Sequence, residues 1–225
     1  MYLSKLILNP RCREVRRDIQ LPYELHRTLA RAFTTADGTN YRAAHGVLFR
    51  IEPLVHPAAH PTVLVQSGSL PDWHELPEAY LLTHPETKVF SASFRENQVL
   101  SFRLLASPTK KEPRPGRQGR RIALSDSVED ETTGLTPART WMVRKGEQHG
   151  FRLIHLMTEE FRFGGGRSKG FAGKNDLPLC GVRFDGLLQI TDPVRLLEAI
   201  QKGIGPSKAF GFGLLSLAPV PEFKG

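Results

Sequence analysis

One order of predicted secondary structure occurs twice along the 225-residue chain, and this feature constrains the fold most. In the first half, short apolar or alternating stretches predict strands over residues 2–8, 46–52 and 61–67. A helix is predicted over residues 22–36, because this stretch opens with a proline, which suits the first helical position. Residues 71–90 have a weaker pattern, which predicts one short helix and a closing strand.

The second half repeats this order, and its clearest element is a helix over residues 192–202. Asp192 is placed to cap its amino end, Pro193 suits its first position, and Gly203 follows its last residue. The other predicted elements are strands over residues 98–106, 151–157, 181–190 and 209–218, a helix over residues 136–146, and a long loop over residues 107–135.

Each half therefore approximates strand–helix–strand–strand–helix–strand, which is the order of the ferredoxin-like, split βαβ motif. The predicted fold class is α+β, with two tandem ferredoxin-like (βαββαβ) domains at residues 1–90 and 95–220. A chain of this length suits two small domains of roughly 100 residues each. The hydrophobic fraction of 40% is ample for packed cores.

Composition excludes several classes of protein. The chain has no run of about 18 apolar residues, which a membrane-spanning helix would need. Its first residues lack a long apolar stretch before a small-residue cleavage site, so we do not expect secretion. Cys12 and Cys180 are the only cysteines, too few for a disulfide framework or a thiolate zinc site. We expect a folded, basic, cytoplasmic protein with no membrane partner.

The net charge of +8 is concentrated in the middle of the chain. Residues 103–183 hold 16 Lys or Arg against 9 Asp or Glu, a net of +7. Most of the excess lies in residues 110–121 and 161–174, and the second stretch also contains three phenylalanines. Cations interleaved with aromatic rings favour RNA or single strands over a merely solvated basic loop. The candidate RNA-binding residues are Arg162, Arg167, Lys169 and Lys174, with Lys110, Lys111, Arg117, Arg120 and Arg121 as secondary candidates.

Residues 203–213 contain two Gly-Φ-Gly triplets, where Φ is an apolar residue, separated by five residues. The dinucleotide-binding fingerprint fails, because Lys208 takes the place of its third glycine. The phosphate-binding loop of nucleotide hydrolases fails because Asn175 follows Gly173-Lys174. Glycines let a backbone approach phosphates closely, but a helix cap followed by a glycine-rich turn explains the same residues. The candidate phosphate-contacting residues are Gly203, Gly205, Lys208, Gly211 and Gly213.

Tyr23 and His26 are three positions apart on the predicted helix over residues 22–36, which makes them neighbours on its surface. They lie in the first turn, where unpaired N–H groups and the helix dipole favour an anion such as phosphate. Imidazole suits proton transfer near neutral pH. The alternative interpretation is a boundary histidine and a partly packed tyrosine. His56 and His60 lie in a proline-rich loop and do not imply a metal site.

The combined motifs resemble a known family. The helix followed by Gly-Φ-Gly-x₅-Gly-Φ-Gly, with a lysine among the five, is similar to the glycine-rich loop of the RAMP superfamily. The resemblance is narrowed by Met-Tyr-Leu-Ser-Lys-Leu-Ile-Leu-Asn-Pro at residues 1–10, Pro-Tyr-Glu-Leu-His-Arg-Thr-Leu at 22–29 and Phe-Asp-Gly-Leu-Leu-Gln-Ile-Thr-Asp-Pro at 184–193. Together these look like the CRISPR RNA-processing endoribonucleases of the type I-E Cascade complex, the CasE/Cse-type proteins.

This resemblance implies two ferredoxin-like domains and an endoribonuclease that needs neither metal nor cofactor. It places the catalytic residues at Tyr23 and His26 and leaves open which is acid and which is base. The RNA 2′-hydroxyl would attack the adjacent phosphorus, leaving a 2′,3′-cyclic phosphate and a 5′-hydroxyl. Arg27, next to His26, is a candidate contact of the scissile phosphate. The expected partners are the CRISPR repeat hairpin, which stays bound as mature crRNA, and other Cascade subunits.

Two alternatives remain open from the sequence. A RAMP-fold subunit could hold processed RNA without cutting it, although a pure binder has no need of the Tyr23 and His26 pair. A generic RNA-binding protein or a metal-dependent nuclease is the weaker alternative, because no compact carboxylate cluster suggests a two-metal site.

Overall fold

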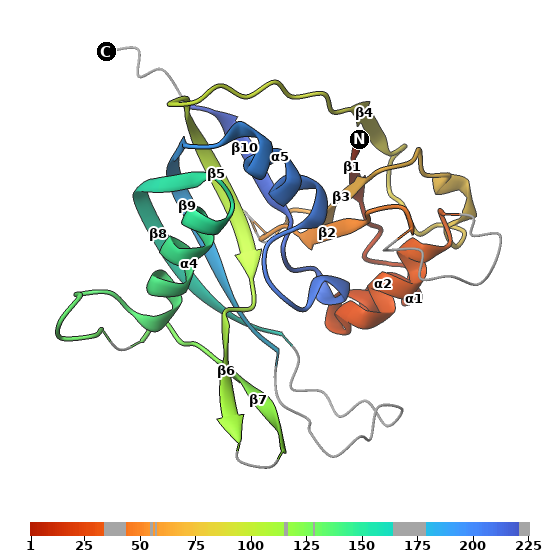
Figure 1. The fold of residues 1–225 in the computed structure, drawn as a ribbon. Coiled ribbons are helices and arrows are strands. Elements are labelled where there is room, and N and C mark those ends of the chain that lie inside the picture. Colours follow the sequence, from red (N-terminus) through yellow and green to blue (C-terminus); the bar gives the residue numbers. More distant parts are fainter. Residues whose placement is uncertain are drawn as a thin grey trace. The chain divides into compact units, whose positions relative to one another are not determined.

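The computed structural model describes residues 1–33, 44–54, 56, 58–114, 117–127, 129–163 and 179–220 (Figure 1). It has a mixed α/β architecture with antiparallel sheets, and its described residues divide into two compact units. The first unit contains residues 1–92, Phe163 and residues 208–211. The second contains residues 93–162, 179–207 and 212–220. Residues 208–211 thus belong to the first unit, although they fall within the range predicted for the second domain.

The first unit is built on a four-stranded antiparallel sheet. In chain order its elements are β1 (Tyr2–Ile7), α1 (Arg13–Gln20), α2 (Pro22–Ala30), β2 (Leu48–Ile51), β3 (Thr62–Ser67), the 3₁₀ helix η1 (Trp73–Glu75), β4 (Glu86–Val89) and the 3₁₀ helix η2 (Lys208–Phe210). The strands lie in the order β2-β3-β1-β4, and all three adjacent pairs are antiparallel. The predicted strands over residues 2–8, 46–52 and 61–67 are therefore confirmed.

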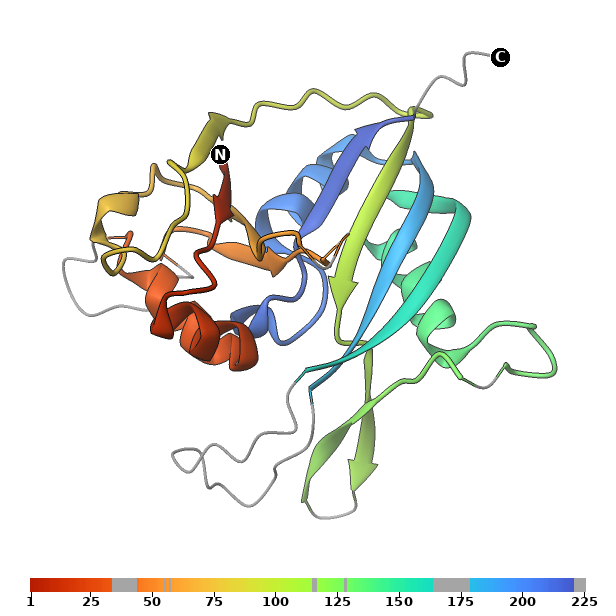
Figure 2. The ribbon, with the colours of Figure 1, turned by 180° about the vertical axis from the view of Figure 1, so that it is seen from behind.

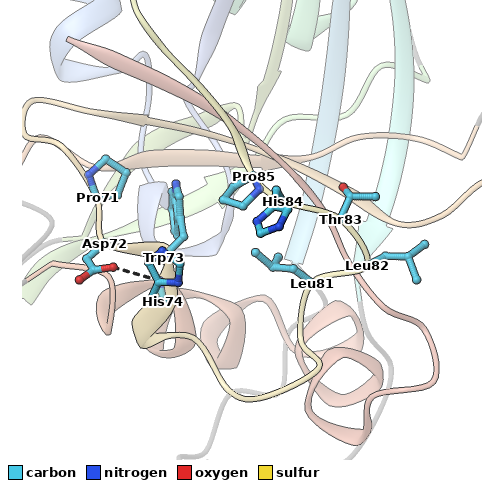
Figure 3. Close-up of a pocket in the computed structure, with 9 residues that line it drawn as sticks. All are labelled: Pro71, Asp72, Trp73, His74, Leu81, Leu82, Thr83, His84 and Pro85. Carbon is cyan, nitrogen blue, oxygen red and sulfur yellow. Dashed lines mark hydrogen bonds between the residues drawn. The ribbon is translucent and has the colours of Figure 1, made fainter.

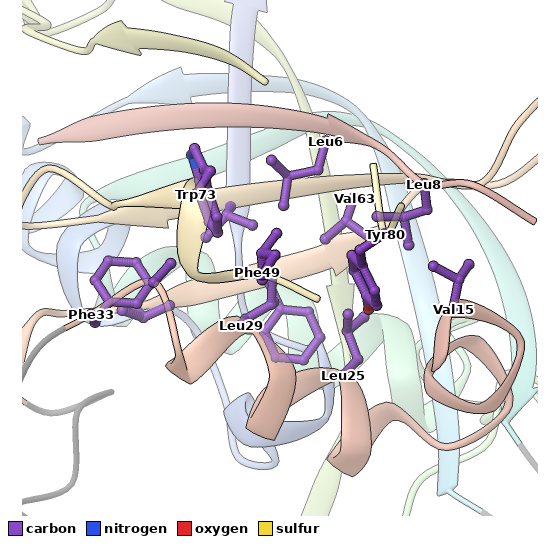
Figure 4. Close-up of a cluster of buried hydrophobic side chains, with 14 residues drawn as sticks. Leu6, Leu8, Val15, Leu25, Leu29, Phe33, Phe49, Val63, Trp73 and Tyr80 are labelled. Atoms are coloured by element: carbon purple, nitrogen blue, oxygen red, sulfur yellow. The ribbon is translucent and has the colours of Figure 1, made fainter. Parts of the chain in front are cut away.

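Buried apolar side chains join the two helices of the first unit to its sheet (Figure 4). Val15 on α1 and Leu25 and Leu29 on α2 are fully buried, as are Leu6 on β1 and Val63 on β3. Burying a side chain of this size contributes about 1.5–3 kcal/mol relative to leaving it exposed. This packing fixes which face of α2 points inward.

The predicted helix over residues 22–36 is wrong in length, and α1 was missed altogether. α2 ends at Ala30, and residues 34–36 lie outside the described residues. α1 reads Arg-Glu-Val-Arg-Arg-Asp-Ile-Gln, in which only two residues are apolar, so periodicity gives little signal. The two helices are separate because the residue before a proline avoids helical geometry; Leu21 has φ −125° and ψ 85°.

The second unit contains another four-stranded sheet, with α4 and α5 on one of its faces (Figure 2). Its elements are β5 (Val99–Ala106), β6 (Thr109–Arg114), β7 (Arg117–Ala123), α4 (Pro137–Gln148), β8 (Phe151–Phe163), β9 (Leu179–Ile190), α5 (Pro193–Lys202) and β10 (Leu215–Pro219). The sheet order is β10-β5-β9-β8, while β6 and β7 form a separate two-stranded sheet. In both four-stranded sheets, the strand that comes last in the chain lies beside the first, followed by the third and the second.

The caps of α5 are those predicted. The Asp192 side chain accepts hydrogen bonds from the backbone N–H groups of Val194 and Arg195, both at 3.0 Å. Gly203 follows the helix with φ 73°, in the region that favours glycine. The predicted strand over residues 209–218 was wrong at its start, because η2 and a turn occupy its first residues and β10 begins at Leu215.

The long loop predicted over residues 107–135 was also wrong, because Thr109–Arg114 and Arg117–Ala123 pair as the strands β6 and β7 of a hairpin. Its sequence is rich in Lys, Arg, Gly and Pro and has no alternating apolar pattern, so strand signals are absent. The hairpin is held by its backbone ladder, with Thr109 opposite Ala123 and Lys111 opposite Arg121. In the described part of the chain, no helix is long and apolar enough to cross a membrane.

A buried carboxylate connects α1 to the segment before β4. Asp18 is fully buried, and it accepts a hydrogen bond from the Tyr80 hydroxyl at 2.8 Å. Its other carboxylate oxygen accepts from Arg17 Nε, also at 2.8 Å. Tyr80 is itself fully buried, and its carbonyl accepts from the backbone N–H of Asn9, just after β1. Burial and the charge of Asp18 raise the pKa of Tyr80 well above its ordinary value.

We expect Tyr80→Phe to lower the free energy of unfolding by about 1.5–3 kcal/mol, since it removes a hydrogen bond to a buried charged group. Denaturant unfolding of the purified protein measures the change. Tyr2→Phe, at a half-buried tyrosine on β1, is the matched control and should cost less. An equal loss in both variants would contradict the role of the Asp18 contact.

The raised pKa of Tyr80 also predicts a pH dependence of stability. Above about pH 10 the unfolded chain releases the phenol proton while the folded protein retains it. The stabilising contribution is therefore complete below about pH 10 and is lost as the pH rises further, by at most about 1.4 kcal/mol per pH unit. Unfolding curves between about pH 9 and 11.5 should show a steeper decline for the wild type than for Tyr80→Phe. Parallel declines would contradict the assignment.

Candidate active site

α2 presents Tyr23 on its exposed side and His26 at the edge of its buried face. Tyr23 is 36% exposed and His26 is half-buried, whereas Leu25 and Leu29 are fully buried in the core. The centroids of the Tyr23 and His26 rings are 6.0 Å apart and their planes are tilted by 41°. The three-residue spacing therefore produces the neighbouring pair that the sequence predicted.

Two phenylalanines from other elements contact this pair. Phe49 on β2 stacks with His26, with ring centroids 6.4 Å apart and an interplanar angle of 19°. Phe210 on η2 lies 5.9 Å from the Tyr23 ring, tilted by 37°. Sequence reasoning missed both, because residues 49 and 210 are distant along the chain and nothing in their local patterns links them to α2. All four aromatic residues belong to the first unit.

The glycine-rich segment contributes to the site through η2, which packs against α2 and β2. This places Lys208 and Gly211 in the same unit as Tyr23 and His26. Gly211 is buried with φ +85°, and a Cβ atom there would lie 3.1 Å from Cε2 of Phe49. The backbone conformation therefore favours glycine at this position, and a side chain there would also crowd the Phe49 ring.

Backbone conformation explains why the other positions of the segment are glycine. Gly203 terminates α5, and Gly205 has φ +87°, with the Trp141 ring 3.1 Å from the position of a Cβ atom. Gly213 has φ +91°. These observations agree with the helix cap and glycine-rich turn considered above. The contacts of these glycines with phosphate stay a prediction.

Arg27 lies one helical turn after Tyr23 and is ion-paired. Its Nη1 is 3.3 Å from a carboxylate oxygen of Glu24, and its side chain is 66% exposed. Glu24 also lies 3.9 Å from Nε of Arg17. A phosphate that binds Arg27 would have to compete with Glu24, so this contact would be weaker than that of an unpaired arginine.

The β6–β7 hairpin, which we name the basic hairpin, displays four of the predicted cations: Lys110, Lys111, Arg120 and Arg121, all exposed. Lys111 lies directly opposite Arg121 across the ladder. Like charges at directly opposed positions destabilise a strand pair. An anion bound between them would relieve this repulsion.

The structure does not describe the side chains of the other RNA-binding cations predicted between residues 103 and 183. Arg117 lies on β7 and Arg162 on β8, but their side chains are outside the described part of the structure. Arg167, Lys169 and Lys174 fall outside the described residues. Their proposed contacts with RNA stay predictions.

A separate cavity of about 600 Å³ opens in the first unit (Figure 3). Trp73, His74, Leu81, Leu82 and His84 are among its lining residues, and the Asp72 carboxylate accepts from the His74 backbone N–H at 3.0 Å. None of the predicted site residues lines it. Among the described residues, no group of three or more His, Cys, Asp or Glu side chains is arranged to hold a metal ion.

A family model described as CRISPR associated protein matches residues 1–219. The chain belongs to this family. Two curated relatives match over nearly the full length of both chains. The CRISPR-associated endoribonuclease Cse3 of Thermus thermophilus is 37% identical, with 97% of this chain and 100% of the relative covered. The CRISPR system Cascade subunit CasE of Escherichia coli is 31% identical, with 98% and 100% covered.

A solved structure of a relative supports the same family assignment. Thermus thermophilus Cse3 bound to an RNA representing a pre-cleavage complex matches with a TM-score of 0.76 and 33% sequence identity. The match covers 97% of this chain and 98% of that one. The resemblance read from the sequence motifs is therefore confirmed.

Proposed function

We propose that this CRISPR-associated protein is a metal-independent endoribonuclease that cleaves CRISPR precursor RNA at repeat hairpins. The observation that carries the proposal is the Tyr23 and His26 pair on α2, partly exposed and with ring centroids 6.0 Å apart. Its family contains Thermus thermophilus Cse3, which is named as an endoribonuclease and is solved with an RNA representing a pre-cleavage complex. A subunit that only binds RNA would not require two adjacent proton-transferring side chains.

The chemistry needs one base and one acid on opposite sides of a phosphorus atom. The base takes the proton from the 2′-hydroxyl as its oxygen bonds to phosphorus, and the acid gives a proton to the departing 5′-oxygen. The products are a 2′,3′-cyclic phosphate and a 5′-hydroxyl. Tyr23 and His26 supply these two roles, with their assignment open, while the cations Arg27 and Lys208 stabilise the charge that develops on the phosphoryl oxygens.

The basic hairpin supplies a second contact with the substrate, in a groove of the A-form stem. Lys110, Lys111, Arg120 and Arg121 are exposed on it, and a narrow two-stranded ribbon can reach phosphates and 2′-hydroxyls. Arg117 on β7 and Arg162 on β8 would extend this contact. Arg167, Lys169 and Lys174, and the backbone of Gly203, Gly205, Gly211 and Gly213, complete the proposed set.

The finer architecture and the assembly belong to the same proposal. Two tandem ferredoxin-like domains, at residues 1–90 and 95–220, agree with the shared strand order of the two sheets. We propose that the protein keeps its product, the mature crRNA, and joins other Cascade subunits in the cytoplasm. The CasE relative is named as a subunit of such a complex.

Cleavage should persist in EDTA and should stop when the nucleotide before the scissile phosphate carries a single 2′-deoxy substitution. Both follow from attack by the RNA's own 2′-hydroxyl with side chains as proton carriers. Gel analysis of a purified repeat hairpin RNA measures cutting, and the 2′-deoxy RNA should still bind. His26→Ala should lower the single-turnover rate by about 10²–10⁴-fold. Loss of cutting in EDTA would overturn the metal-independent chemistry. Tight binding with no cutting by the wild type would favour the RNA-binding subunit.

The double variant Lys111→Ala/Arg121→Ala should weaken binding of the repeat hairpin and reduce its salt dependence. Removing a side chain that binds a phosphate lowers the slope of log K against log salt by about 0.7–0.9. Fluorescence anisotropy at several salt concentrations measures the slope. The matched control is Arg195→Ala/Lys202→Ala on α5, which removes the same charge from residues ion-paired to Asp192 and Glu198. Equal effects of the two double variants would show only a general influence of net charge.

A further inference from the structure

The two rings proposed for proton transfer each contact a phenylalanine from outside their helix. His26 stacks on Phe49 of β2, and Tyr23 contacts Phe210 of η2. Tyr23 and His26 also contact each other, so the four rings form a continuous series from η2 through α2 to β2. Ring centroid separations of 5.9–6.4 Å fall within the range of favourable aromatic contacts.

Phe49 is held more firmly than the side chain it contacts. It is only 1% exposed and belongs to the same buried cluster as Leu25 and Leu29, which anchor α2. The buried backbone of Gly211 approaches its ring closely enough that a Cβ atom there would lie 3.1 Å away. His26, by contrast, is half-buried at the edge of the core. The stack therefore connects a partly exposed imidazole to a fixed surface.

We infer that Phe49 and Phe210 are positioning residues that fix the orientations of His26 and Tyr23 for cleavage; this inference rests on the proposed function. The contact with Phe49 limits how the imidazole ring can turn, and therefore limits the direction in which its two nitrogens point. Proton transfer depends on that direction, because misplacement by about 1 Å can cost as much as 10²-fold in rate. Binding of RNA depends on it far less, since most of the binding surface lies elsewhere.

A double-mutant cycle tests whether Phe49 acts through His26. Phe49→Leu should lower the single-turnover cleavage rate at least about tenfold in the wild-type background. In the His26→Ala background the same change should alter the residual rate less than twofold, because the ring that it orients is gone. Affinity for the 2′-deoxy repeat RNA should stay within twofold throughout. An equal loss of rate in both backgrounds would overturn the inference.

Phe33→Leu is the matched control, because Phe33 is another buried aromatic residue of the same core and contacts Trp73 and His45 instead. It should change the cleavage rate less than twofold at temperatures where the protein stays folded. A loss as large as that of Phe49→Leu would assign the effect to core packing in general. If Phe49→Leu does not fold, the cycle is run with Phe210→Leu against Tyr23→Ala, because Phe210 is half-buried.

A measurement without RNA separates this inference from the proposed function. The ring current of Phe49 shifts the NMR signals of the His26 ring protons, so Phe49→Leu should move them and Phe33→Leu should not. Unmoved signals would overturn the positioning contact even if the enzyme cleaves RNA. Moved signals in a wild-type protein that cuts no repeat RNA would leave the contact in place and overturn the endoribonuclease proposal.

Discussion

The position of α2 depends on the buried carboxylate of Asp18. Loss of the hydrogen bond from Tyr80 to this buried charged group would cost about 1.5–3 kcal/mol, and this contact holds α1 beside Tyr80. Arg17, which donates to Asp18, also lies 3.5 Å from the Thr28 hydroxyl and 3.9 Å from Glu24, both on α2. The apolar core gives α2 its buried face, while this polar network limits how far the helix can slide along that core. The apolar core and the polar network together therefore determine where Tyr23 and His26 lie.

Ion pairs within the second unit neutralise part of its basic excess. Counting charges along the sequence gives +7 to residues 103–183, but several of those arginines are neutralised within the second unit. Arg103 and Arg183 both bond to Asp185, and Arg139 lies 3.7 Å from Asp126. In the basic hairpin Arg120 faces Glu112, whereas Lys111 faces Arg121. An external anion could balance the charge of the Lys111 and Arg121 pair at close range.

Elements that carry their own local signal could be predicted from the sequence, and elements that depend on distant partners could not. α5 was predicted with both caps, because Asp192 and Gly203 act within one helical turn. α1 was missed because its stability comes from burying Val15 and Asp18 against distant residues rather than from an apolar stripe. The basic hairpin was missed because its strands pair through backbone hydrogen bonds that no side-chain pattern reports. The Tyr23 and His26 pair was predictable because helical spacing alone makes them neighbours.

Phe49, Phe210 and Gly211 could not be assigned to the site in that way, since their roles appear only when β2, α2 and η2 come together. This changes the physical meaning of the glycine-rich segment. Its glycines were predicted to contact phosphate, yet positive φ values and close contacts with Phe49 and Trp141 already favour glycine at positions 211 and 205. A segment built first to bring Phe210 and Lys208 beside α2 can still bind phosphate. In that case the glycine-rich segment would act in the proposed cleavage through the side chains of Phe210 and Lys208 as much as through its backbone N–H groups.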